Sequence, residues 1–117
     1  MYALKNKVQL IGNLGNVPDV RTTQNGKKWA RFSMATSETY RDAKGEKVTE
    51  TQWHNLVAWG KNAQIAEKYF EKGRSLAVEG KLITRNYVDK DGVKKYITEI
   101  QVNEILLLGS KDSKKQV

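Results

Sequence analysis

Two tryptophans lie in one short segment, residues 52–60, whose sequence is QWHNLVAWG. Successive side chains of an extended strand point to opposite faces, so Trp53 and Trp59 would share one face. Leu56 and Ala58 would lie on the other face and suit a protein core. A ring opposite the core is a platform on which an unpaired nucleobase can stack, which is worth about 1–3 kcal/mol per base for any base. The segment therefore predicts a surface that binds single-stranded nucleic acid.

Packing is the alternative interpretation of these rings, because aromatic side chains in strands often contact a core or a neighbouring strand. The charge of the chain favours the binding interpretation. It has 21 Lys and Arg against 13 Asp and Glu, a net charge of +8. A basic surface attracts polyanions such as nucleic acid, although a lysine-rich surface could also serve solubility alone. Trp29 fits a base platform and a buried subunit interface equally well.

Further aromatic and basic residues lie near the ends of the expected strands. Tyr40 ends one strand and Tyr87 approaches a hairpin turn, so both join Trp53 and Trp59 as candidate stacking platforms. Cations interleaved with these rings would follow the phosphates of a bound strand. The expected phosphate contacts are Lys7, Arg21, Arg31, Arg41, Lys61 and Arg85.

The elements that must position these side chains are mostly strands. Alternating apolar residues predict strands over residues 8–14, 28–40, 49–60, 74–88 and 94–108. Asn25-Gly26 and Asp91-Gly92 are hairpin signals, and residues 15–19 form a turn. Residues 61–72 predict the single helix, with Gly73 as its C-cap and an apolar stripe that places Tyr69 and Phe70 in the core.

This order of strand, strand, strand, helix, strand and strand is typical of the OB-fold. That fold is all-β with one helix, a five-stranded Greek-key barrel, here with long hairpin loops. Gly12 and Gly80, in the middle of strands, fit sharp bends at barrel corners. An SH3-like barrel would leave the helix unexplained. We expect one OB-fold domain over residues 1–109 and a short, basic, disordered tail over residues 110–117.

Several classes of function are disfavoured. Without cysteine there is no disulfide or thiolate metal site, and a single histidine cannot form a multi-histidine site. The chain has no phosphate-binding loop of the GxxxxGK[ST] type and no HExxH motif, so we expect no enzyme activity, metal or cofactor. It has no signal-peptide pattern and no apolar run long enough to cross a membrane. We therefore expect a cytoplasmic protein that does not bind membranes.

Six segments, NKVQLIGNLG, PDVR, ATSE, QWH, EKY and VEGKLITR, occur in order within about residues 5–105. In these the chain resembles the bacterial single-stranded DNA-binding protein family. The resemblance implies an OB-fold homotetramer around which single-stranded DNA wraps without strong sequence preference. It also implies a role in DNA replication, recombination and repair.

The resemblance extends to individual residues. Four stacking positions of that family fall on Tyr40, Trp53, Trp59 and Tyr87, and the family histidine that supports tetramer assembly falls on His54. Some members have tryptophan at the two tyrosine positions and phenylalanine at Trp59, changes that keep a ring face. The family typically continues into a Gly/Pro/Gln-rich linker and an acidic tip that recruits replication and repair proteins. This sequence ends at residue 117 after basic residues, so we do not expect it to recruit replication or repair proteins through an acidic tip.

Two alternatives stay open from the residues alone. One is an RNA-binding or primosome-type OB protein, because stacking does not read the 2′-hydroxyl. The other is an oligosaccharide-binding or purely structural OB oligomer, whose binding would be independent of salt.

Overall fold

The computed structural model describes residues 5–109 of the chain, so the predicted tail over residues 110–117 lies outside the described part. Seven elements follow one another, in an all-β arrangement with one helix as predicted. They are β1 (Val8–Leu14), β2 (Asp19–Thr22), β3 (Lys28–Arg41), β4 (Lys47–Trp59), α1 (Lys61–Tyr69), β5 (Ser75–Val88) and β6 (Lys94–Leu107).

Five of the strands close into a barrel. β1 pairs with β5 along most of its length and with β3 at Asn13 and Leu14. β3 pairs with β4, and β5 pairs with β6, in antiparallel ladders. β4 and β6 complete the ring through a short parallel contact in which Leu56 faces Ile100. This closed ring with a single helix confirms the OB-fold.

β2 is a strand that the sequence analysis did not predict. It adds to the edge of β3 outside the ring, with Arg21 opposite Trp29. Its four residues, DVRT, include a single apolar side chain, that of Val20, so they show no alternating pattern. The free edge of β3 provides its hydrogen bonds, and Asn25-Gly26 forms the predicted turn between the two strands.

The interior holds one face of each strand. Phe32 and Met34 of β3 and Leu56 of β4 are fully or almost fully buried, as the alternation predicts. The ring of Phe32 meets that of Phe70 edge to face, with centroids 5.0 Å apart and planes at 84°. The other buried core residues are Leu14, Ala30, Ala58, Ala63, Ala66, Leu76, Val78, Ile100 and Val102.

The helix is shorter than predicted. It ends at Tyr69, and its C-cap is Phe70, in an extended conformation, rather than Gly73. Ala63, Ala66 and Phe70 face the barrel, so Phe70 is buried as predicted. The prediction that Tyr69 belongs to the core is wrong, because its side chain is 44% exposed. Phe70 leaves the helix in an extended conformation and packs on Phe32, whereas the ring of Tyr69, the last helical residue, lies 5.4 Å from Nζ of Lys68.

Gly12 and Gly80 mark places where another strand crosses closely. A Cβ atom on Gly12 would lie 2.1 Å from the carbonyl oxygen of Ala35, and one on Gly80 would lie 2.1 Å from that of Gln101. The β5–β6 register also shifts between Glu79 and Gly80. Both positions therefore require glycine for close backbone approach, which agrees with the predicted barrel corners.

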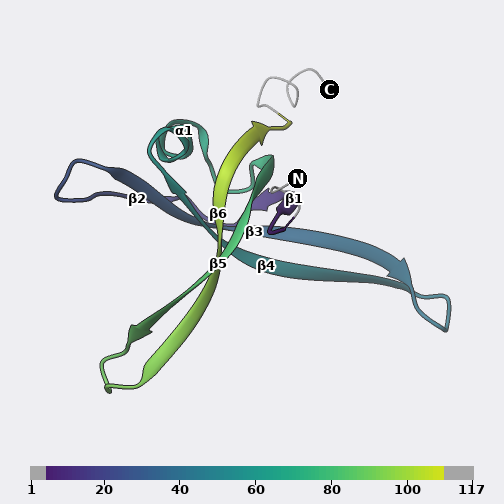
Figure 1. The fold of residues 1–117 in the computed structure, drawn as a ribbon. Helices are drawn as coiled ribbons and strands as arrows, with labels where there is room; N and C mark the ends of the chain where they lie inside the picture. The colour runs from purple at the N-terminus through teal and green to yellow at the C-terminus, as the bar shows by residue number, and fades with distance from the viewer. Residues whose placement is uncertain (1–4, 110–117) are drawn as a thin grey trace.

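The long hairpins extend beyond the barrel (Figure 1). β3 and β4 project together to one side as a two-stranded ribbon, and β5 and β6 project in another direction. The β2–β3 hairpin leaves the barrel as a third, shorter arm. The ladders stay paired almost to their turns, with Arg41 opposite Lys47 and Val88 opposite Lys94. These arms carry several of the predicted binding residues outside the core.

Candidate nucleic-acid interface

The outer face of the β3–β4 ladder carries three tryptophans. Trp29 lies directly opposite Trp59, and Ala35 lies opposite Trp53. Trp53 is 62% exposed and Trp59 is 38% exposed, so both lie outside the core on the predicted face. Val57 shares this face between them but is buried, with 6% exposure. It lines a hollow together with Ile83 and Arg85 of β5 and Glu99 of β6, a neighbourhood that the pattern of one strand does not show.

Two ribbons form a groove at this face. β3 and β4 contribute one wall and β5 and β6 the other, and the hollow between them has a volume of about 360 Å³. Its lining residues are Trp29, Arg31, Val57, Trp59, Ile83, Arg85 and Glu99. The groove thus combines aromatic rings with charged side chains from strands that are distant in sequence.

The rings in the groove contact one another and several cations. The centroids of Trp29 and Trp59 are 6.1 Å apart and their planes are inclined by 36°. The guanidinium of Arg31 lies 5.3 Å from the centroid of Trp29, and the Nζ atom of Lys27 lies 5.1 Å from that of Trp59. Arg21 reaches Trp29 from the neighbouring strand β2 at 6.0 Å. Such cation–π contacts are worth about 0.5–1 kcal/mol at exposed sites.

Lys27 was missed in the sequence analysis. It follows the Asn25-Gly26 turn, and the hairpin brings it beside the β4 ring of Trp59. Its position in the sequence, between the Asn25-Gly26 turn and Trp29, was the one indication that it could join the aromatic site.

A buried carboxylate lies at the floor of the groove. Glu99 is only 2% exposed. Its oxygens accept hydrogen bonds from Nε and Nη2 of Arg85, at 2.9 and 3.4 Å, and Nε of Arg31 lies 3.4 Å away. The hydrogen bond to Glu99 raises the pKa of Arg85 above its ordinary value, so its guanidinium remains charged.

Glu99 was not predicted from the sequence as a site residue. A carboxylate one residue before the core residue Ile100 was the only signal. Nothing in the local pattern showed that two arginines from other strands would meet it.

Trp53 lies at the other end of the same face. It is six residues from Trp59 along β4, which corresponds to roughly 20 Å of extended strand. The ring packs beside Gly15, where an added Cβ would lie 2.3 Å from Cζ3 of Trp53. The β1–β2 turn therefore supports this ring from one side and leaves much of it open to solvent.

The two candidate tyrosines lie on the projecting ribbons. Tyr87 shares the face of β5 that carries Ile83 and Arg85, so it continues the wall of the groove outward. Tyr40 faces Val48, and by alternation it shares the face of Met34, opposite to that of Trp53. Its side-chain hydrogen bond to Glu50, and secondarily partial desolvation, raise the pKa of Tyr40. Both rings are substantially exposed, but only Tyr87 aligns with the groove.

The six predicted phosphate contacts do not form one cluster. Arg31 and Arg85 line the groove, and Arg21 approaches Trp29 while pairing with Asp19 at 3.2 Å. Lys7 pairs with Glu79 at 3.3 Å on the β1–β5 side of the barrel. Nη1 of Arg41 donates to the carbonyl of Gly45 at 2.9 Å, and Lys61 is exposed at the first position of α1.

The comparisons with known proteins agree with this geometry. The model of the single-strand binding protein family matches residues 5–108. The chain belongs to this family. Single-stranded DNA-binding protein 1 of Chlorobaculum tepidum is 49% identical over 109 residues, which cover 92% of this chain and 67% of that protein. The protein of the same description from Xylella fastidiosa is 43% identical over 113 residues, 96% of this chain and 83% of that protein.

Solved structures of the single-strand binding family share the fold. A Plasmodium falciparum SSB in complex with ssDNA superposes with a TM-score of 0.81 at 36% identity, covering 89% of this chain and 95% of that one. A deletion mutant of the single-stranded DNA binding protein from Thermus aquaticus gives a TM-score of 0.77 at 30% identity, covering 91% of this chain and 51% of that one. A single-stranded DNA-binding protein of Neisseria meningitidis is 43% identical over 107 residues. These residues cover 92% of this chain but 62% of the Neisseria protein, which is longer than this chain.

His54 lies on the core-facing side of β4, the side of Leu56 and Ala58. It faces Met34 in the ladder and is half-buried. Its Nε2 atom lies 2.9 Å from Oγ1 of Thr36. One hydrogen bond across the ladder therefore holds the ring at the margin of the core.

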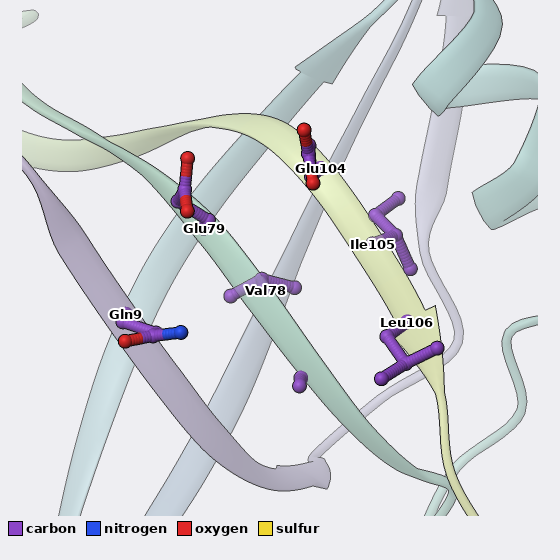
Figure 2. A pocket seen from close by; sticks show the side chains of 7 residues that line it. Gln9, Val78, Glu79, Glu104, Ile105 and Leu106 are labelled. Atoms are coloured by element: carbon purple, nitrogen blue, oxygen red, sulfur yellow. The ribbon is translucent and has the colours of Figure 1, made fainter. Parts of the chain in front are cut away.

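A second hollow, of about 320 Å³, lies on the outer face of β1, β5 and β6, away from the tryptophans. Figure 2 shows Gln9 of β1, Glu79 of β5 and Glu104 of β6 side by side at this face. The next row across the three strands is apolar and consists of Ile11, Ala77 and Leu106. Ile11 is 68% exposed and Leu106 is 62% exposed.

Neither a metal site nor a membrane helix is evident in the described part. Residues 5–109 contain no group of three or more side chains that could ligate a metal ion. The nine-residue α1 is also too short to cross a membrane.

Proposed function

We propose that this chain binds single-stranded DNA without strong sequence preference, through the groove and the adjoining outer face of β3 and β4. The observation that carries the proposal is the exposed aromatic face of Trp53 and Trp59, flanked by cations and placed opposite the core. Membership of the single-strand binding family and the fold shared with an SSB solved with ssDNA support it. The site has the parts that base stacking and phosphate contacts require.

Each group of residues has its own role. Trp53, Trp59 and Tyr87 stack on bases, and Tyr40 provides a further ring on the β3–β4 arm. Trp29 supports Trp59 inside the groove, where the two rings are in contact. The cations contact phosphates, which accounts for affinity without sequence preference, because every base has a π-face and every nucleotide has a phosphate. The predicted phosphate contacts remain Lys7, Arg21, Arg31, Arg41, Lys61 and Arg85.

Assembly into a homotetramer is part of the proposal. The exposed apolar row of Ile11, Ala77 and Leu106 is suited to contact between copies. Four copies in a closed symmetric assembly would present a continuous surface around which one strand can wrap. His54, on the core-facing side of β4 and hydrogen-bonded to Thr36, is our proposed residue of the interface between copies.

In the cell, such binding protects and organises single strands during replication, recombination and repair. This role places the protein in the cytoplasm, at the nucleoid. It requires no catalysis, cofactor or metal, and we propose none. We also propose that residues 1–109 act as the binding domain and that residues 110–117 are an accessory tail.

Fluorescence titration with dT, rU and duplex oligomers, each at two salt concentrations, tests the proposal with the protein's own tryptophans as reporters. We expect strong quenching by oligo-dT and little by duplex. Affinity should fall by about 0.7 log units per log unit of salt for each phosphate contacted. Equal affinity for duplex would refute it, a preference for rU would favour an RNA-binding protein, and binding that ignores salt would favour a saccharide-binding one.

A further inference from the structure

We propose that Glu99 is an internal competitor for DNA phosphate, which lowers the affinity and the salt dependence of the groove. This inference rests on the proposed single-stranded DNA binding. Glu99 is the only charged residue that is buried among residues 5–109. It lies at the floor of a groove that otherwise combines tryptophans and cations, where a negative charge opposes a polyanion.

The carboxylate occupies the donors that a phosphate would use. Nε and Nη2 of Arg85 and Nε of Arg31 point to its two oxygens, at 2.9 to 3.4 Å. Carboxylates and phosphates match the same planar fork of guanidinium donors. A phosphate that enters the groove can therefore use these particular donors only by sharing them with Glu99 or by replacing it.

The arginines remain accessible while they hold Glu99. The side chains of both Arg31 and Arg85 are 44% exposed, whereas that of Glu99 is 1% exposed. Each guanidinium has five N–H donors, and the contacts to Glu99 use one or two of them. The remaining donors can meet a phosphate at the mouth of the groove while the carboxylate stays beneath.

The burial of Glu99 makes its charge effective. An ion away from water is screened less than one on the surface, so its repulsion of a nearby phosphate is stronger. Arg31 and Arg85 together carry a charge of +2, and the negative charge of Glu99 reduces the total at this site to +1. The two arginines therefore attract a strand more weakly than two free surface arginines would.

A competitor and a purely positioning residue predict opposite effects of neutralising Glu99. If Glu99 competes, Glu99→Gln frees donors and adds positive charge, so binding becomes tighter and releases more counterions. If Glu99 only holds the arginines in place, the same change lets them move and binding becomes weaker. Glutamine has nearly the size of glutamate and keeps one acceptor oxygen, so the substitution tests charge more than shape.

The experiment measures oligo-dT affinity of the full chain by tryptophan fluorescence at several salt concentrations. Asp91→Asn is the matched control, because it makes the same charge change in an exposed turn and creates an equally suitable Asn-Gly pair. Relative to that control, Glu99→Gln should bind about fivefold more tightly at low salt, the effect of one unit charge several ångströms from a phosphate. The slope of log affinity against log salt should steepen by about 0.7 for each added phosphate contact.

An affinity equal to that of Asp91→Asn, or a weaker one, would overturn the proposal. Failure of the wild type to bind oligo-dT would instead defeat the proposed function on which the inference rests. Circular dichroism establishes whether Glu99→Gln folds. If the variant does not fold, NMR of the wild-type protein tests the proposal through the Nε–H signals of Arg31 and Arg85. Added oligo-dT should shift both signals if phosphate competes with Glu99 for these donors. Unshifted signals at full tryptophan quenching would overturn the proposal.

Discussion

Trp29 and Trp59 face each other across the β3–β4 ladder, with ring centroids 6.1 Å apart, and each ring also contacts a cation. This pair forms one wall of the groove, and Glu99 lies between two arginines at its floor. Trp53 lies further along β4 and is supported by a glycine. The proposed binding surface thus has two aromatic regions on one face, which different substitutions can separate.

Removing either exposed tryptophan should weaken DNA binding without unfolding the protein. We expect Trp53→Ala and Trp59→Ala each to reduce the binding free energy by about 1–3 kcal/mol per stacked base. Tyr40→Ala and Tyr87→Ala should act in the same direction. Titration with labelled oligo-dT measures the effect, and circular dichroism checks the fold. Tyr69→Ala is the control, because it removes an exposed ring on α1 outside the groove. Unfolding of both tryptophan variants would show that these rings are packing residues.

Gly15 offers a way to move Trp53 without removing it. A methyl group at Gly15 would lie 2.3 Å from Cζ3 at the far end of the Trp53 side chain, so the ring would have to shift. We expect Gly15→Ala to weaken oligo-dT binding by up to the value of one stacked base, about 1–3 kcal/mol. The thermal midpoint should fall less than in Gly12→Ala, where the methyl group meets a backbone carbonyl 2.1 Å away. Unchanged DNA affinity in Gly15→Ala would mean that the position of Trp53 is unimportant.

Leu56→Ala should have the reverse profile. Leu56 is fully buried beside Phe32 in the ladder, on the face opposite the tryptophans. Its truncation should cost about 2–5 kcal/mol of unfolding free energy, measured by urea denaturation. The oligo-dT affinity of the folded protein should change little, because the outer face is retained. A large loss of affinity at full folding would show that the two faces are coupled.

Assembly can be tested at His54. We predict a homotetramer by light scattering, at micromolar concentration and neutral pH. His54→Tyr should shift it towards monomers, because a larger ring would be forced into the packed interface that we propose at this position. Lys44→Tyr, which places the same ring in an exposed turn, should leave the assembly intact. A wild-type protein that is monomeric at all concentrations would defeat wrapping, although stacking could persist.

The faces of individual strands were predictable because alternation is a property of the extended backbone itself. Trp53 and Trp59 lie opposite Leu56 and Ala58 whatever the rest of the chain does. The order of strands and helix was sufficient to predict the OB-fold, and Gly12 and Gly80 were sufficient to predict the corners of its barrel. The error at Tyr69 came from the helix end, where a shift of a few residues decides which of two neighbouring rings enters the barrel.

The groove itself was not predictable. It exists because residues of β5 and β6 line the same hollow as residues of β3 and β4, and because Glu99 meets Arg31 and Arg85 from two other strands. The sequence alone determined which residues share a face and that the chain carries a basic excess. The tertiary structure alone decided which charges pair, since pairing depends on the closure of the barrel and has no period along the chain.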